Sequence, residues 1–142
     1  MLISTRGRYA LRVMLELAQD TSGEYLPLPV LAARQDISEK YLEGIVSALV
    51  KAGLLEGQRG KRGGYRLARA PEACSVGEIL RLTEGSLAPV ACLEAAENTC
   101  PRAPTCPTLP VWRRLDTLIT GYLESVTLAE LLQEKGDAPC EG

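Results

Sequence analysis

Residues 37–69 read ISEKYLEGIVSALVKAGLLEGQRGKRGGYRLAR, and this stretch decides the fold. Its first part predicts a helix, because Ser38 is a good N-cap, Glu39 stabilises the first turn and Gly53 provides a C-terminal stop. Four apolar residues at helical spacing form an inward face: Leu42, Ile45, Val46 and Leu49. The outward face consists of polar or small residues: Lys40, Glu43, Gly44 and Ser47.

The second part of the stretch predicts a β-hairpin with a basic tip. Two strand-like runs, residues 54–56 and 65–67, flank the segment QRGKRGG at residues 58–64. Glycines in this segment permit a tight turn with positive φ. Residues 54–69 hold five basic side chains and one acidic side chain. No Lys-Ser or Lys-Thr pair follows the glycines, which excludes a P-loop.

Two more helices are expected before this stretch. A buried helical stripe over about residues 4–20 is indicated by Tyr9, Ala10, Val13, Met14, Leu17 and Ala18. Pro29 suits the first turn of a second helix that ends near Gln35, and a short turn at residues 36–37 leads into the third helix. Two helices joined in this way and followed by a basic hairpin predict a winged helix-turn-helix over residues 1–70.

A winged helix-turn-helix predicts binding to double-stranded DNA. The net charge is −2, but residues 1–70 hold eleven Lys and Arg against seven Asp and Glu, whereas residues 71–142 hold five against eleven. Positive potential is thus concentrated in the first half. Lys40, Glu43 and Ser47 on the outward face of the third helix are expected to enter the major groove, where Glu43 could accept from a cytosine amino group, and Ser38 and Tyr41 are further candidate DNA contacts. Arg59, Lys61 and Arg62 are expected to meet phosphates or the minor groove. Lys51 and Arg66 are expected to be solvated charges, and a surface hairpin without a ligand is the alternative for the wing.

The second half predicts a connecting helix, a long helix and a short terminal helix. A capping box at residues 75–78 opens the connecting helix of segment 71–84, and a second box at residues 127–130 opens the terminal helix, which ends near Gly136. The long helix begins near Pro110 and carries an apolar stripe: Val111, Leu115, Leu118, Tyr122 and Val126. This stripe either folds back onto the N-terminal core or pairs with a second subunit. Pairing is favoured, because regulators of this size usually bind two half-sites.

The expected fold is therefore mainly α with a small β-hairpin wing. It combines a winged helix-turn-helix with a long C-terminal dimerisation helix in segment 110–136, and it leaves a tail at residues 137–142.

Three cysteines mark residues 85–109 as a candidate sensor loop. Cys92, Cys100 and Cys106 are separated by seven and five residues, unlike the Cys-x-x-Cys knuckle of structural zinc sites. Three thiols on a Pro-rich loop favour zinc or an iron–sulfur cluster, and inert or disulfide-prone cysteines are the alternative. Cys74 and Cys140 are expected to be bystanders.

The chain gives no sign of export, membrane insertion or catalysis. It has neither a signal-peptide pattern nor an apolar run long enough to span a membrane, so a cytoplasmic, reducing location is expected. Five cysteines in such a compartment are poor evidence for a disulfide framework. Histidine is absent, and no Ser or Cys has an evident activating base. An enzyme is therefore not expected.

Taken together, the motifs resemble the iron–sulfur transcription regulator family that includes IscR and NsrR. The resemblance covers nearly the whole chain and is carried by residues 2–12, 37–43, 59–65, 75–79, 111–112 and 119–123 and by the three loop cysteines. It implies a homodimer with a winged helix-turn-helix at each end and crossed long helices between them. It also implies a 2Fe–2S or 4Fe–4S cluster ligated by Cys92, Cys100 and Cys106.

Two departures from this family leave the fourth cluster ligand unknown. IscR-like members have a histidine where this chain has Leu109, and NsrR-like members can use an acidic residue where this chain has Arg8. The first gap between the cysteines is also longer than in IscR-like members. The remaining candidates are Glu94, Glu97, Asp116, Cys140 or an exogenous thiol or water.

The predicted function is a homodimeric DNA-binding transcriptional regulator that is modulated by an iron–sulfur cluster. The alternative keeps the DNA-binding dimer and makes the cysteines a thiol redox switch or a zinc site. An interaction scaffold that needs no DNA would leave the basic hairpin unexplained.

Overall fold

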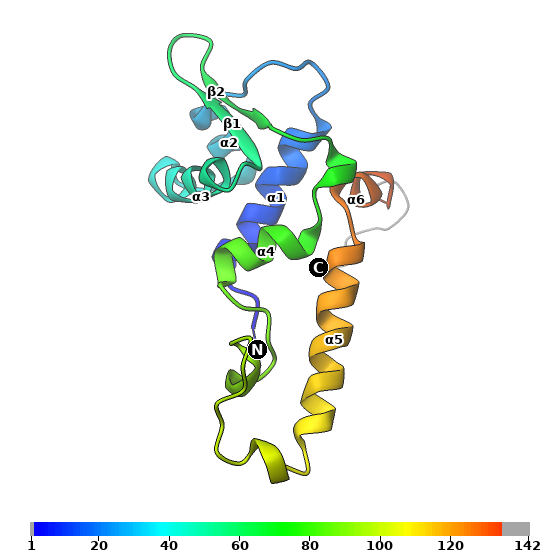
Figure 1. The fold of residues 1–142 in the computed structure, drawn as a ribbon. Coiled ribbons are helices and arrows are strands. Elements are labelled where there is room, and N and C mark those ends of the chain that lie inside the picture. The colour runs from blue at the N-terminus through cyan, green and yellow to red at the C-terminus, as the bar shows by residue number, and fades with distance from the viewer. Residues whose placement is uncertain (1, 135–142) are drawn as a thin grey trace.

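The computed structural model describes residues 2–134 and contains six α-helices and one two-stranded antiparallel sheet within them (Figure 1). The expected class, mainly α with a small β-hairpin, is confirmed. The elements are α1 (Thr5–Gln19), α2 (Leu28–Gln35), α3 (Glu39–Lys51), β1 (Leu55–Gln58), β2 (Gly64–Leu67), α4 (Val76–Glu84), α5 (Leu109–Ser125) and α6 (Leu128–Glu134).

Helix α1 is the centre of the N-terminal core, with α2, α3, α4 and α6 packed around it. Five of the six residues of its predicted apolar stripe are buried, and Tyr9 is partly buried against the core. The helix begins where Ser4 Oγ accepts a hydrogen bond from the Gly7 N–H at 3.0 Å. Ser4 Oγ also donates to Glu84 Oε1, and Gly7 lies close to that carboxylate. The start of α1 is therefore joined to the end of α4.

The helix-turn-helix forms as the sequence predicts. Asp36 ends α2 in the left-handed conformation with φ of 54°, and its N–H donates to the carbonyl groups of the last helical turn. Ser38 then caps α3, because its side chain accepts a hydrogen bond from the Tyr41 N–H. All four residues of the predicted inward face of α3 are buried: Leu42, Ile45, Val46 and Leu49.

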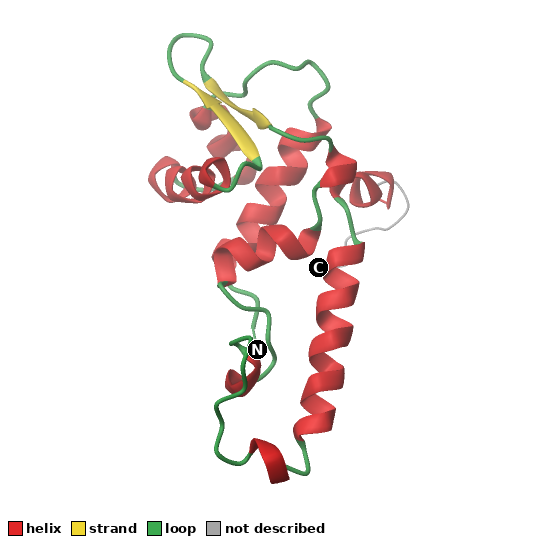
Figure 2. Ribbon diagram, viewed as in Figure 1, coloured by secondary structure: helices red, strands yellow, loops and turns green. Residues whose placement is uncertain are grey.

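The wing consists of β1 and β2 and the tip between them, residues 59–63. Its register pairs Leu55 with Leu67 at the base and Gln58 with Gly64 at the tip. The strands lie slightly closer to the tip than the apolar runs suggest, because backbone pairing continues to Gln58. Figure 2 shows this hairpin at the opposite end of the molecule from the loop that joins α4 to α5.

In both predicted capping boxes, the first residue caps the helix with its side-chain hydroxyl group. Ser75 Oγ accepts from the Glu78 N–H at 3.1 Å, and Thr127 Oγ1 accepts from the Glu130 N–H at 3.2 Å. A capping box also predicts that the Glu78 carboxylate accepts from the Ser75 N–H. This prediction is wrong, because the Glu78 carboxylate accepts from Arg69 Nη2 at 2.7 Å. The end of the terminal helix near Gly136 and the tail lie outside the described residues.

Helix α5 does not fold back onto the N-terminal core along its length. It starts at Leu109, one residue before the predicted start, and its C-terminal end packs against α4, where Gly77 lies close to Leu123 and Glu124. Four residues of its apolar stripe are exposed: Val111, Leu115, Leu118 and Tyr122. None of the helices within residues 2–134 has the length and apolar character needed to cross a membrane.

Candidate nucleic-acid interface and cysteine loop

The outward face of α3 presents the residues that the sequence predicts for DNA contact. Ser38, Lys40, Tyr41 and Glu43 are all exposed. The Tyr41 ring packs edge-on against Tyr9 of α1, with ring centroids 6.0 Å apart, and the Arg12 guanidinium lies over the other ring, 5.2 Å from the centroid of Tyr9. Tyr41 is thus packed against α1 at the helix surface.

The wing tip presents the second predicted set of contacts. Arg59, Lys61 and Arg62 are exposed, and none of them is ion-paired within residues 2–134. A groove between α3 and the wing is lined by Ser47, Lys51, Gln58 and Arg59, among others. The helix face and the tip therefore border one continuous surface with free positive charge, as phosphate binding requires.

Arg6 borders the α3 surface, although the sequence did not mark it as a candidate DNA contact. Arg6 of α1 lines a hollow with Ser38, Lys40 and Tyr41, and its Nη2 lies 3.5 Å from the Gly44 carbonyl oxygen of α3. The only signal in the sequence is that Arg6 lies in the basic first half of the chain, residues 1–70.

Arg66, expected to be a solvated charge, has a side chain that is 42% exposed, but the structure also gives it partners. Arg66 donates to the Glu56 carboxylate and to the Gly23 carbonyl group. Its partner Gly23 is distant in sequence, so the contact could be recognised only after folding. Lys51, the other residue expected to be solvated, is exposed.

The cysteine loop, residues 85–108, connects α4 to α5 and carries three partly exposed free thiols: Cys92, Cys100 and Cys106. Cys92 lies in a short 3₁₀ turn, and the Cys100 N–H donates to Asn98 Oδ1 at 2.9 Å. Cys74 differs from these three because it is fully buried at 0% exposure in the N-terminal core, and burial raises the pKa of its thiol.

Cys106 has the most clearly defined surroundings of the loop thiols. Its sulfur lies 3.4 Å from Thr108 Oγ1, at the point where α5 begins. A hydrogen bond from the Thr108 hydroxyl lowers the pKa of Cys106, helped by backbone N–H groups and by the charge of Arg102. The thiolate, which is the form that binds metal or reacts, is therefore favoured here.

The donor set fits a thiolate-ligated group in chemistry but is not assembled in this conformation. Within residues 2–134, no group of three or more Cys, Asp or Glu side chains is placed to hold a metal ion. The three loop cysteines are therefore not brought together, and neither Glu94, Glu97 nor Asp116 completes a site with them. Cys140, the other protein candidate for a fourth ligand, lies outside the described residues.

Comparison with known proteins identifies the family of the chain and agrees with its winged-helix fold. A family model named Rrf2, described as an iron-dependent transcriptional regulator, matches residues 3–134. The chain belongs to the Rrf2 family. Among curated relatives, the HTH-type transcriptional regulator IscR of Vibrio cholerae is 36% identical over 134 residues, which cover 94% of this chain and 76% of that protein.

Solved structures of Rrf2-type regulators share the fold. CymR, the global cysteine regulator of B. subtilis, matches with a TM-score of 0.76 and 35% identity over 94% of this chain and 97% of that one. IscR of T. potens matches with a TM-score of 0.75 and 33% identity over 98% and 93% of the two chains. The predicted winged-helix DNA-binding regulator is thereby confirmed, as is the expectation that the protein is not an enzyme.

Proposed function

We propose that this Rrf2-family regulator is a cytoplasmic homodimer that binds a two-half-site operator, and that an iron–sulfur cluster on Cys92, Cys100 and Cys106 modulates its affinity. The observation that carries the DNA contact is the surface shared by α3 and the wing tip. Arg59, Lys61 and Arg62 stand there exposed and without acidic partners in the described part of the chain. Such charges release counterions on meeting phosphates, whereas paired charges would first have to be separated.

The homodimer is supported by the exposed stripe of α5. Leu118 and Tyr122 are 52% and 67% exposed on a helix whose N-terminal part stands away from the core. A long helix with such a stripe is stabilised by burying it against another apolar surface. A second copy provides an identical stripe and places a second α3 for the other half-site.

The sensor role is supported by donor chemistry. Thiolates are the ligands that iron–sulfur clusters take from proteins, and three thiols lie partly exposed on one loop. Assembly of a cluster would require this loop to change conformation, because the three thiols are not close enough together within residues 2–134 to hold one metal ion. Coupling of about 1–3 kcal/mol between cluster occupancy and DNA affinity is enough to switch operator occupancy.

A thiol switch is the second candidate, and a specific observation favours it. The Thr108 hydroxyl lies 3.4 Å from the Cys106 sulfur and lowers the pKa of that thiol, and CymR, a cysteine regulator, shares the fold. In this version, oxidation or thiol modification of the loop takes the place of cluster loss, and the DNA interface is unchanged. Zinc bound by the same thiols is a further form of this alternative.

DNA contact is tested with Arg59→Ala and a duplex selected from a random-sequence pool by the wild-type protein. The dependence of log affinity on log salt should become less steep by about 1 if Arg59 meets a phosphate. Arg113→Ala is the matched control, because it removes the same charge from an exposed position of α5 outside both the proposed DNA interface and the cysteine loop. Unchanged affinity and slope in Arg59→Ala would remove Arg59 from the interface.

The sensor is tested by anaerobic purification followed by visible spectroscopy and assay of iron, zinc and acid-labile sulfide. Iron and sulfide that disappear in Cys92→Ala, Cys100→Ala and Cys106→Ala, but persist in Cys74→Ala, support a cluster. Metal-free protein whose DNA affinity changes reversibly with thiol oxidation supports the switch. A protein with neither metal nor oxidation-dependent affinity would refute both sensor models.

A further inference from the structure

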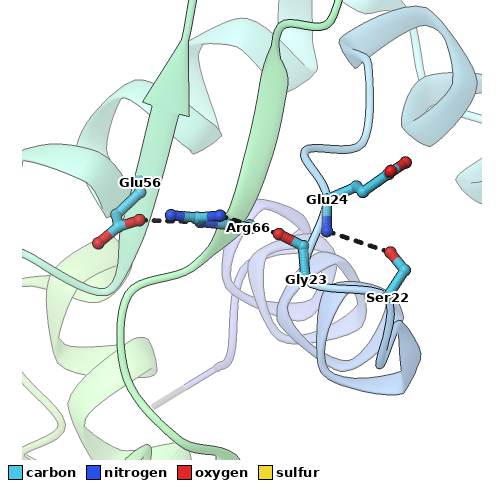
Figure 3. Close-up of polar contacts among 5 residues, drawn as sticks. All are labelled: Ser22, Gly23, Glu24, Glu56 and Arg66. Atoms are coloured by element: carbon cyan, nitrogen blue, oxygen red, sulfur yellow. Dashed lines mark hydrogen bonds and ion pairs between the residues drawn. The ribbon is translucent and has the colours of Figure 1, made fainter.

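Arg66 of β2 joins three segments of the chain (Figure 3). Its Nε lies 2.9 Å from Glu56 Oε2 of β1, and its Nη1 donates to the Gly23 carbonyl oxygen at 2.8 Å. Its guanidinium carbon lies 4.3 Å from the ring centroid of Tyr25. One side chain therefore ties both strands of the wing to the loop at residues 20–27.

The backbone continues this connection along the edge of β2. The N–H groups of Leu26 and Tyr65 each donate to the other residue's carbonyl oxygen, both at 2.9 Å. Gly64 allows this approach, since a Cβ there would collide with the Leu26 carbonyl group. The loop is thus joined to the outer edge of β2 by one isolated β-bridge.

The loop at residues 20–27, which Arg66 contacts, is held in a defined shape by its own hydrogen bonds. The Ser22 N–H donates to Asp20 Oδ1 at 2.9 Å, and the Glu24 N–H donates to Ser22 Oγ at 3.1 Å. Hydrogen bonds from Ser22 lower the pKa of Asp20, so the accepting carboxylate is charged at neutral pH. Arg66 is therefore attached to an ordered segment anchored on the end of α1.

These contacts separate Arg66 from the other basic side chains of the wing. Arg59, Lys61 and Arg62 have no acidic partner within residues 2–134, whereas the guanidinium of Arg66 is engaged by a carboxylate, a carbonyl group and a ring. An isolated two-stranded hairpin is only marginally stable, so its direction must come from contacts at its base. Arg66 lies at that base.

We propose that Arg66, with Glu56, Tyr25 and the Gly23 carbonyl group, is a positioning residue for DNA binding that holds the wing at the angle at which its tip and α3 meet one duplex. It contacts no phosphate itself. The proposal rests on the proposed DNA contact of the wing tip. A lysine cannot take over this role, because it lacks the planar guanidinium that donates in two directions while stacking on a ring.

The experiment measures affinity for the selected duplex as a function of salt concentration in three variants. Arg66→Met removes the cation and keeps an apolar stem, and Glu56→Ala breaks the same network by removing an anion. Both should weaken binding, by about tenfold and about fivefold, because each disturbs the direction of the wing. The cost arises because the loosened wing must be re-ordered before it binds, and the bound complex keeps the phosphate contacts of the tip. Both variants should therefore leave the slope of log affinity against log salt unchanged.

Arg62→Gln is the comparison with a predicted phosphate contact. It should weaken binding and lower the magnitude of the slope by about 0.9. The inference is overturned if Arg66→Met lowers the slope by the same amount, or if Glu56→Ala strengthens binding, because both results identify Arg66 as a direct contact. Failure of Arg59→Ala and Arg62→Gln to change either quantity refutes the proposed wing contact instead.

Hydrogen exchange provides a second readout that does not depend on DNA. The Leu26 and Tyr65 amides should lose protection in both Arg66→Met and Glu56→Ala, while amides of α1 and α3 keep theirs. If Arg66→Met does not fold, Glu56→Ala carries the test, because Glu56 is exposed on β1. Full protection of both amides in Glu56→Ala would contradict the proposal.

Discussion

Gly64 is the position at which a single methyl group should do most damage to the wing. Its φ is 145°, a conformation that side-chain-bearing residues rarely adopt. A Cβ at this position would also collide with the Leu26 carbonyl group and lie 2.7 Å from the Pro27 nitrogen. These neighbours are backbone atoms, so they can move only if the paired segments separate.

The cost of Gly64→Ala has two parts. Holding alanine at this φ costs about 1–3 kcal/mol. Separating the segments breaks the two hydrogen bonds between Leu26 and Tyr65, each worth about 0.5–1.5 kcal/mol. The free energy of unfolding should therefore fall by about 2–6 kcal/mol.

Gly60→Ala is the matched control for this prediction. Gly60 also has a positive φ, 104°, but nothing lies within 4 Å of a Cβ placed there. It should therefore show only the conformational cost of about 1–3 kcal/mol. Urea unfolding followed by circular dichroism measures the stability of both variants. Equal losses of stability would show that the close approach of Leu26 does not explain the need for glycine at position 64.

Four further predictions concern the core, the start of α1 and the thiols. Leu128→Ala should lower the free energy of unfolding by about 3–5 kcal/mol in the same assay, because Leu128 is fully buried between α6 and the core. Ser4→Ala should cost about 1 kcal/mol through loss of the N-cap, and a stability equal to wild type would contradict the capping role. Thr108→Val should slow alkylation of Cys106 at neutral pH in the metal-free protein, because the hydroxyl lowers the pKa of Cys106 and its loss reduces the thiolate fraction; the rate profile should move to higher pH. Peptide mass spectrometry should find Cys74 unmodified in the folded protein, since it is buried and burial raises the pKa of its thiol.

The helices and the wing could be predicted from the sequence because their signals are local. Ser38 caps α3 through an N–H three residues later, and the inward stripe of α3 follows from its own periodicity. The glycines around the wing tip specify a turn for the same reason. The exposed basic residues of the candidate DNA interface were then found by their position on these elements.

The partners of charged side chains were decided only by the tertiary structure. Glu78 has the spacing of a capping box, yet its carboxylate is taken by Arg69. Arg66 resembles its basic neighbours in sequence, but folding places Gly23 and Tyr25 against it. An ion pair forms with whichever group packing brings within reach, and that distance is not encoded by spacing along the chain.

The sequence by itself determined the order of the elements, the basic wing and the three thiols of the cysteine loop. Tertiary structure alone decided which face of α5 stays uncovered, which arginine anchors the wing and how the thiols lie relative to one another. The division has one physical cause. Capping, periodicity and turn chemistry act over a few residues, whereas burial, ion pairing and ligand assembly depend on through-space distances that exist only once the helices have packed.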